Sequence, residues 1–243
     1  MTIVQEVKKA IILNAGEGRR LRPLTLNKPK CLLEVGEKTI LFTQLSNLSS
    51  CGINEIIMVV GYYSEKIIDF SKKNFPNLKF RFLQNDLYAT TNTLHSLWIG
   101  TQRLNDDFVL LNGDVVFSQN VLRSLLDSRY ETCLAIHKHK VGEEEVKVLL
   151  HDDLILEIGK QLQSFEADGE FTGVAKFSKK DCQAMKTKLS KIVKNAGSCN
   201  YFEYAVDSML EKHDIYAVDV SNFPVIEVDT KEDLEQARNL FKI

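Results

Sequence analysis

The chain has 243 residues, of which 44% are hydrophobic and 26% are charged, a composition that suits one soluble globular domain with a large buried core. Lysine and arginine number 31 against 33 acidic residues, and the formal net charge of −2 excludes the broad basic surface of proteins that bind nucleic acid or anionic membranes. The 5 cysteines are scattered and form no C-x-x-C pair, so neither a disulfide framework nor a zinc site is predicted.

The N-terminal segment MTIVQEVKK contains no apolar signal core. No stretch of the chain approaches the roughly 18 apolar residues that a membrane-spanning helix needs. We therefore expect a cytoplasmic protein with reduced thiols and no membrane partner, folded as a single domain over residues 1–243. The sequence leaves open whether the chain forms a homo-oligomer.

The first half of the chain alternates short apolar runs with stretches of helical spacing. Apolar β-branched runs separated by helices are typical of a parallel sheet that is covered on both faces. Strands are predicted at residues 9–15, 55–60, 78–83 and 108–111, and helices at residues 41–51, 64–73 and 93–104.

From residue 133 onward, predicted strands follow one another closely, and Asp152-Asp153 can form a tight turn between two of them. The chain is therefore expected to adopt an α/β fold, Rossmann-like, with a mixed, mainly parallel sheet flanked by helices and an added antiparallel region. Strands are predicted at residues 133–139, 146–151, 154–158, 171–177, 215–220 and 225–228, and helices at residues 179–194 and 201–213 and after residue 230.

The loop after the first strand concentrates glycine and arginine: Gly16 and Gly18 stand among the arginines of residues 19–22. Backbone N–H groups beside glycines can approach phosphate oxygens, and guanidinium groups match those oxygens. A dinucleotide-binding loop would need a small residue in place of Leu21, and a Walker loop would need Gly-Lys-Ser or Gly-Lys-Thr. Pro29 can direct Lys30 toward the same phosphates. The loop predicts a triphosphate site, a solvated basic loop being the alternative.

Two aspartates follow predicted strands: Asp114 in Asn112-Gly113-Asp114, and Asp229 in Val228-Asp229-Thr230. Open α/β sheets place ligands at the ends of such strands. Mg²⁺ prefers oxygen ligands, commonly one or two carboxylates with phosphates and water. Asp114 and Asp229 are therefore predicted to bind Mg²⁺, the alternative being a turn residue and a helix cap.

Residues 13–30 read L-x-A-G-x-G-x-R-L-x-P-L-T followed by K-P-K, and residues 227–230 read E-x-D-T. Both strings resemble the nucleotidyltransferase family that activates sugar phosphates and phosphocholine, although Asn14 departs from the family's usual alanine. The resemblance implies a fold of the nucleotide-diphospho-sugar transferase type. It also implies that Arg20 and Lys30 hold the β- and γ-phosphates. The loop residues that would cradle the triphosphate are Leu13, Asn14, Ala15, Gly16, Glu17 and Gly18.

Amides and hydroxyls are dense after the second and third predicted strands, where the family reads its base. Asn85, Asn92 and backbone groups near Leu13 could pair with one edge of a pyrimidine, but their spacing does not separate cytosine from uracil. An ordinary polar loop with Asn92 near a helix N-cap is the alternative. The resemblance to the short cytidylyltransferases favours CTP. The further nucleotide-binding residues expected are Gly61, Tyr62, Asn85, Thr90, Asn92 and Asn112.

Three residues of the second half are expected on the acceptor side. By resemblance Lys160 meets the acceptor phosphate and takes part in catalysis, and Glu170 could hold a cationic amine. Glu203 could face an ammonium, although a surface lysine, a solvated turn and a packed helix are the ordinary alternatives. His137 and His139 alternate on a predicted strand without an acid or thiol beside them in sequence, and they are not predicted as metal ligands.

The resemblance as a whole implies an Mg²⁺-dependent cytidylyltransferase that joins CTP to a small phosphorylated, amine-bearing acceptor and releases pyrophosphate. Phosphoglutamine, used in capsule polysaccharide biosynthesis, is the acceptor it favours. Residues 1–130 would mainly bind the nucleotide and residues 131–243 the acceptor. A sugar 1-phosphate nucleotidyltransferase and a non-catalytic nucleotide-binding regulatory subunit remain alternatives.

Overall fold

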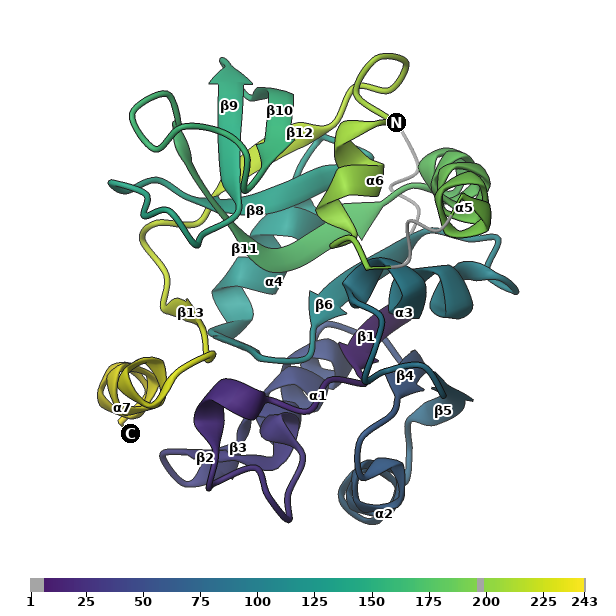
Figure 1. Ribbon diagram of the computed structural model, residues 1–243, viewed down its shortest axis with the longest axis vertical. Helices are drawn as coiled ribbons and strands as arrows, with labels where there is room; N and C mark the ends of the chain where they lie inside the picture. The colour runs from purple at the N-terminus through teal and green to yellow at the C-terminus, as the bar shows by residue number, and fades with distance from the viewer. Residues whose placement is uncertain (1–6, 196–198, 243) are drawn as a thin grey trace.

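The structure is a computed structural model that describes residues 7–195 and 199–242. A mixed sheet of nine strands runs through the middle of the molecule (Figure 1). The α/β fold predicted from the alternation of strands and helices is therefore confirmed. In sheet order the strands are β5 (Lys79–Gln84), β4 (Glu55–Val60), β1 (Lys9–Asn14), β6 (Phe108–Asn112), β11 (Gly169–Phe177), β8 (Cys133–His137), β12 (Tyr216–Asp219), β10 (Leu154–Gly159) and β9 (Lys147–His151).

The sheet has a parallel part and a part with antiparallel strands, as predicted. In the first, β1 pairs in parallel with β4 and β6, and β4 pairs in parallel with β5. In the second, β11 runs antiparallel to both β6 and β8, and β9 and β10 form a hairpin. The turn of that hairpin is Asp152-Asp153, with His151 opposite Leu154. Asp152 has a φ of 56°, a left-handed conformation that aspartate tolerates better than most residues.

Helices cover both faces of the sheet because successive strand residues point to opposite sides. In β1, Ile11 and Leu13 belong to the core on one face, and Ala10 and Ile12 to the core on the other. Helices α3 (Thr93–Thr101), α5 (Lys179–Lys194) and α6 (Glu203–Asp207) pack on the first face, and α1 (Ile40–Ser50), α2 (Ser64–Asn74) and α4 (Gln119–Asp127) on the second.

Two predicted helices are shorter than expected, and α4 is absent from the prediction. The helix predicted at residues 93–104 ends at Thr101, and the one predicted at residues 201–213 is helical only over α6. After Asp207 the chain tightens into i to i+3 turns, with the Met209 amide donating to the Val206 carbonyl at 2.9 Å. The Asp207 carboxylate accepts from the Ile158 amide at 3.1 Å, which ties this turn to β10.

A small ladder outside the main sheet brings the two predicted metal ligands together. Strand β7 (Val115–Phe117), which the sequence did not predict, pairs antiparallel with β13 (Val225–Glu227). The Val228 amide donates to the Asp114 carbonyl at 3.0 Å and extends the ladder by one step. Asp114 and Asp229, which flank the ladder, are thereby neighbours in space. The hairpin β2 (Glu34–Val35) and β3 (Lys38–Thr39) packs against α7 (Lys231–Leu240) beside them (Figure 1).

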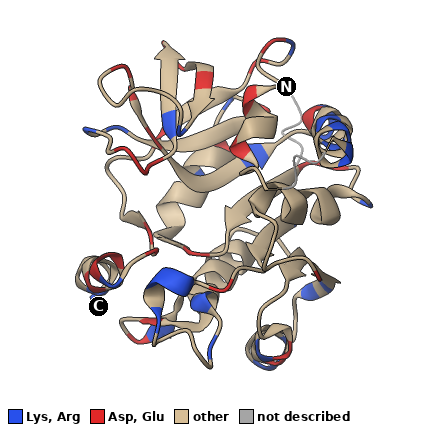
Figure 2. Cartoon of the chain, in the orientation of Figure 1, with Lys and Arg blue, Asp and Glu red and all other residues tan. Residues whose placement is uncertain are grey.

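Basic and acidic residues are interspersed over the described part of the fold (Figure 2), in line with the net charge of −2. Within residues 7–195 and 199–242, no helix is long and apolar enough to cross a bilayer. Most of the segment MTIVQEVKK, on which the expectation about a signal core rests, lies in residues 1–6 and outside the described residues.

Candidate active site

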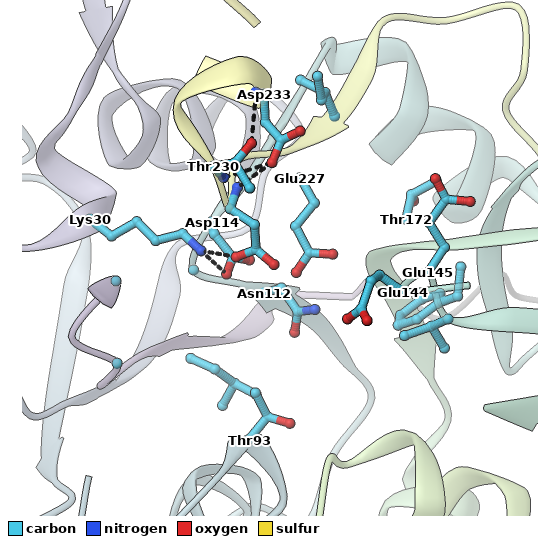
Figure 3. Close-up of a pocket in the computed structure, with 18 of the residues that line it drawn as sticks. Lys30, Thr93, Asn112, Asp114, Glu144, Glu145, Thr172, Glu227, Thr230 and Asp233 are labelled. Atoms are coloured by element: carbon cyan, nitrogen blue, oxygen red, sulfur yellow. Dashed lines mark hydrogen bonds and ion pairs between the residues drawn. The ribbon is translucent and has the colours of Figure 1, made fainter. Parts of the chain in front are cut away.

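A cavity of about 1040 Å³ opens where β1 and β6 end and is lined by both halves of the chain. Figure 3 shows Lys30, Asp114 and Glu227 on one side of it and Glu144 and Glu145 on the other. Its volume suits a nucleotide together with a small second substrate. The predicted site residues that line it are Leu13, Asn14, Gly16, Gly18, Arg20, Lys30, Asn92, Asn112, Asp114, Lys160, Glu170, Glu203 and Asp229.

Lys30 lies between two carboxylates. Its Nζ donates to Asp114 Oδ2 at 2.8 Å and also to Asp229 Oδ1 (Figure 3). Arg20 donates to the second carboxylate oxygen of Asp229. Burial by itself would lower the pKa of Lys30, but the two carboxylates outweigh it and raise that pKa. Burial would raise the pKa of Asp229, and Lys30 and then Arg20 lower it instead. The basic loop and the two aspartates therefore form one charged network.

Glu227 is a third carboxylate of this network, and the sequence interpretation did not assign it a role. It stands two residues before Asp229 in the extended chain, so both side chains can point to the same side. Carboxylate oxygens of Asp114, Glu227 and Asp229 lie within 4.8 Å of one another. Burial first, and then the charges of Asp114 and Asp229, raise the pKa of Glu227 well above its ordinary value. The E-x-D-T string was the available signal for this residue.

The three carboxylates fit a divalent cation. Asp114 Oδ1 is buried, and none of the described residues offers it a hydrogen bond. A buried carboxylate oxygen without a partner is costly, and a bound cation would satisfy it. Three carboxylates on one side of a cavity otherwise open to substrate phosphates and water match the ligands that Mg²⁺ prefers.

The glycine loop is folded back toward Lys30. Gly18 has a φ of 61°, and a Cβ added there would lie 3.0 Å from Lys30 Cβ. The Thr25 hydroxyl donates to the Gly18 carbonyl at 2.8 Å. The Tyr62 hydroxyl donates to the Thr25 and Leu26 carbonyls at 3.0 and 2.9 Å. These contacts fix the loop so that Gly16, Gly18 and Lys30 line the same cavity.

Two buried asparagines face the cavity beside the loop. Asn14 and Asn112 are 6% and 9% exposed. In the part of the chain that the structure describes, Asn14 Nδ2 and Asn112 Oδ1 have no hydrogen-bond partner. The Asn14 side chain packs against the backbone of Gly113, since a Cβ there would lie 2.0 Å from Asn14 Oδ1. One buried donor and one buried acceptor beside the cavity are therefore without a partner among the described residues.

Six predicted nucleotide-binding residues do not line the cavity. The Ala15 carbonyl accepts from the Tyr62 amide at 3.1 Å, and Glu17 pairs with Arg19 and Arg22. Asn85 is 1% exposed, and its amide donates to Ser96 Oγ at 3.1 Å. Such contacts support the residues that line the cavity. For these six residues, contact with the nucleotide stays a prediction. They are Ala15, Glu17, Gly61, Tyr62, Asn85 and Thr90.

The three residues predicted to bind the acceptor, Lys160, Glu170 and Glu203, all line the cavity. Lys160 Nζ lies 5.0 Å from the ring centroid of Tyr201 and 4.0 Å from the Glu144 carboxylate. His139 Nε2 lies 2.9 Å from Glu170 Oε2. Glu203 is 4% exposed, and its Oε2 has no partner within the described residues. Burial raises the pKa of Glu203 to about 7.

The raised pKa of Glu203 predicts a pH-dependent cost in stability. Between its ordinary value of 4.5 and about 7, the folded protein keeps a proton that the unfolded chain has lost, so stability falls as pH rises through this window. Glu203→Gln removes this cost. We expect the variant to gain about 2–3 kcal/mol of unfolding free energy at pH 8 and little at pH 5, measured by urea denaturation in EDTA. A variant no more stable than the wild type at pH 8 would contradict this.

Comparisons with known proteins show what this chain is similar to. A family model described as nucleotidyl transferase matches residues 9–153. Choline-phosphate cytidylyltransferase of Streptococcus pneumoniae is 27% identical over 96% of this chain and 98% of its own. CTP:phosphoglutamine cytidylyltransferase of Campylobacter jejuni is 29% identical over 70% of this chain and 72% of its own. A solved structure of CTP:phosphocholine cytidylyltransferase from S. pneumoniae superposes with a TM-score of 0.83 and 25% identity, over 98% of this chain and 100% of the other.

Proposed function

Since the chain belongs to the nucleotidyl transferase family, we propose that it transfers a cytidylyl group from CTP to a small phosphorylated, amine-bearing acceptor and releases pyrophosphate. The observation that carries the proposal is that two differently charged groups of residues line facing sides of one cavity. One side offers Lys30, Arg20 and the carboxylates of Asp114 and Asp229, and the other offers Lys160 among acidic residues. A triphosphate and a phosphorylated cation are complementary to these two sides.

Mg²⁺ is the proposed cofactor, held by Asp114, Asp229 and the newly recognised Glu227. When bound, it would neutralise phosphate charge and orient the triphosphate against the carboxylates. Asp114 Oδ1 supports this assignment, because it is buried and has no hydrogen-bond partner in the described part of the chain. The three carboxylates lie beside Lys30, whose ammonium group in this structure balances the charge of Asp114 and Asp229.

The protein's own residues position the reacting groups. Lys30 and Arg20 turn from Asp229 to the β- and γ-phosphates and stabilise the charge that develops on departing pyrophosphate. Backbone amides of residues 13–18 bind the triphosphate oxygens from the other side. The acceptor's phosphate oxygen then attacks the α-phosphorus in line with the leaving group. No protein nucleophile is required, because the acceptor provides the attacking oxygen.

CTP is the proposed nucleotide because the relatives named above are cytidylyltransferases. Asn92 lines the cavity, and its side-chain oxygen accepts from the Thr93 amide at 2.9 Å, so its amide nitrogen is the group that would donate to a base. The buried donor of Asn14 and the buried acceptor of Asn112, which have no partner among the described residues, are two more polar groups beside the cavity. Residues 1–130 would thus mainly bind the nucleotide and residues 131–243 the acceptor.

The proposed acceptor to test first is phosphoglutamine, with Lys160 at its phosphate and Glu170 and Glu203 near its ammonium. The experiment supplies Mg²⁺, each nucleoside triphosphate in turn, and phosphoglutamine, phosphocholine, an aminoalkylphosphonate or glucose 1-phosphate, and follows pyrophosphate release. We expect release with CTP and an amine-bearing acceptor. Release with a sugar phosphate and UTP would replace the proposal by a sugar 1-phosphate nucleotidyltransferase. Nucleotide binding without release under any condition would favour a regulatory subunit.

A further inference from the structure

The acceptor side contains a second cluster of polar groups, apart from the three carboxylates beside Lys30. It consists of His139, Glu145 and Glu170, whose ligand atoms lie within 4.8 Å of one another. His139 follows β8, Glu145 precedes β9, and Glu170 lies in β11. Three separate segments thus converge on one point of the cavity wall.

The orientation of His139 shows which kind of ligand this point favours. Its Nδ1 lies 3.1 Å from the Lys140 carbonyl, which can only accept a hydrogen bond, so Nδ1 carries a hydrogen. Its Nε2 lies 2.9 Å from Glu170 Oε2. In the neutral ring this places a nitrogen lone pair against a carboxylate oxygen. The two atoms then need either a proton between them or a cationic N–H group that donates to both from the cavity.

The cluster remains negative in either protonation state of the imidazole, because two carboxylates outweigh one imidazolium. Burial raises the pKa of Glu170, His139 lowers it, and the carboxylates of Glu145 and Asp233 raise it again. Glu203 adds a further carboxyl group to the same cavity, and it is 4% exposed with Oε2 unpartnered within residues 7–195 and 199–242. A cationic ligand would offset this excess of negative groups.

Two lysines on the segments beside this cluster, Lys147 and Lys160, are directed elsewhere. Lys160 lies over the Tyr201 ring. Lys147 is 1% exposed and donates to the backbone carbonyls of Glu143, Glu145 and Lys160 at 2.7, 3.3 and 3.2 Å. A buried ammonium that holds three carbonyls fixes the loop that carries Glu145. The Gly142 amide also donates to Glu145 Oε2 at 2.5 Å. The cluster is therefore a built feature rather than a chance group of surface acids.

We propose that His139, Glu145 and Glu170 bind the primary ammonium group of the acceptor and select it over a quaternary ammonium. This rests on the proposed function and names its substrate class. A primary ammonium has three N–H donors, which the carboxylate oxygens of Glu145 and Glu170 and Nε2 of the neutral His139 ring can accept. Hydrogen bonds between charged groups are the strong ones. A quaternary ammonium has no N–H and is recognised by aromatic faces. Of the described aromatic residues lining the cavity, Phe171 is 2% exposed and Tyr201 already lies under Lys160.

Phosphoethanolamine and phosphocholine test this directly, since they share the phosphate and the two-carbon spacer and differ only in the methyl groups on nitrogen. With saturating CTP, we expect the wild type to favour phosphoethanolamine in kcat/KM by about tenfold or more. Glu170→Gln keeps the side-chain shape and removes the charge. It should raise the KM for phosphoethanolamine about tenfold or more, change the KM for phosphocholine by less than about threefold, and leave the KM for CTP unchanged.

Glu166→Gln is the matched control, because Glu166 is exposed, lies four residues earlier and does not line the cavity. It should leave both acceptors unaffected. Dissociation constants of the same two compounds, measured by calorimetry, test the ammonium site without turnover. A protein that is inactive but still binds phosphoethanolamine more tightly than phosphocholine would refute the proposed function and support this inference. A preference for phosphocholine, or equal effects of Glu170→Gln on both compounds, would overturn it. So would Zn²⁺ binding that His139→Ala abolishes in a protein indifferent to the two amines.

Discussion

Replacing Asp114 by asparagine is expected to lower kcat/KM for pyrophosphate release by about 10³-fold, the largest effect of any single substitution in this site. The change keeps the size of the side chain and removes its charge. Asp114 Oδ2 contacts Lys30 at 2.8 Å, and Oδ1 is the buried oxygen left without a partner among the described residues. An amide offers one oxygen at most, so a cation bound by the three carboxylates loses charge and a ligand.

The measurement follows initial rates with CTP and the best acceptor over a range of Mg²⁺ concentrations, beside thermal unfolding with and without Mg²⁺. Asp114→Asn should show neither activity nor the Mg²⁺-dependent rise in unfolding temperature that ligand binding gives the wild type. Asp127→Asn, at the exposed end of α4, makes the same chemical change away from the cavity and should behave as the wild type. Full activity in Asp114→Asn would remove this residue from the metal site.

Replacing Lys30 by methionine is expected to lower kcat/KM by about 10²–10³-fold and to destabilise the metal-free protein by about 3–5 kcal/mol. The Lys30 side chain is 12% exposed and contacts both Asp114 and Asp229. Without it, the carboxylates of Asp114, Glu227 and Asp229 repel one another in a half-buried position. The loss in activity has a separate cause, because the substitution also removes a cation from the departing phosphates.

These two effects separate experimentally. Mg²⁺ should restore much of the stability of Lys30→Met, since a cation can replace the ammonium among the carboxylates, but it should not restore activity. Lys28→Met removes a lysine two residues earlier whose side chain is 40% exposed, and it should change neither property by more than a small factor. Stability that does not respond to Mg²⁺ would argue against a metal site at these carboxylates.

The sequence determined those features that contiguous residues fix. The apolar runs of β1, β4 and β6, the glycine loop and helix α5 lie where the pattern placed them, because backbone propensity and side-chain period are local properties. Asp114 and Asp229 were also predicted as a pair, since each follows a strand whose apolar run ends abruptly, and they lie close together. The end of helix α6 was not predicted from the sequence. There the Asp207 carboxylate accepts from the Ile158 amide of β10, a contact between distant segments, and the helix gives way to turns.

Only the tertiary structure decided which of these residues meet. The pairing of β7 with β13 brings Glu227 beside Asp114, and the pairing of β11 with β8 brings Glu170 beside the end of the strand that leads to His139. His139 has no acidic neighbour in sequence, yet Glu170 lies 2.9 Å from it in the fold. Such contacts depend on strand register between distant segments, and register follows from which faces are buried in the completed sheet rather than from any local pattern.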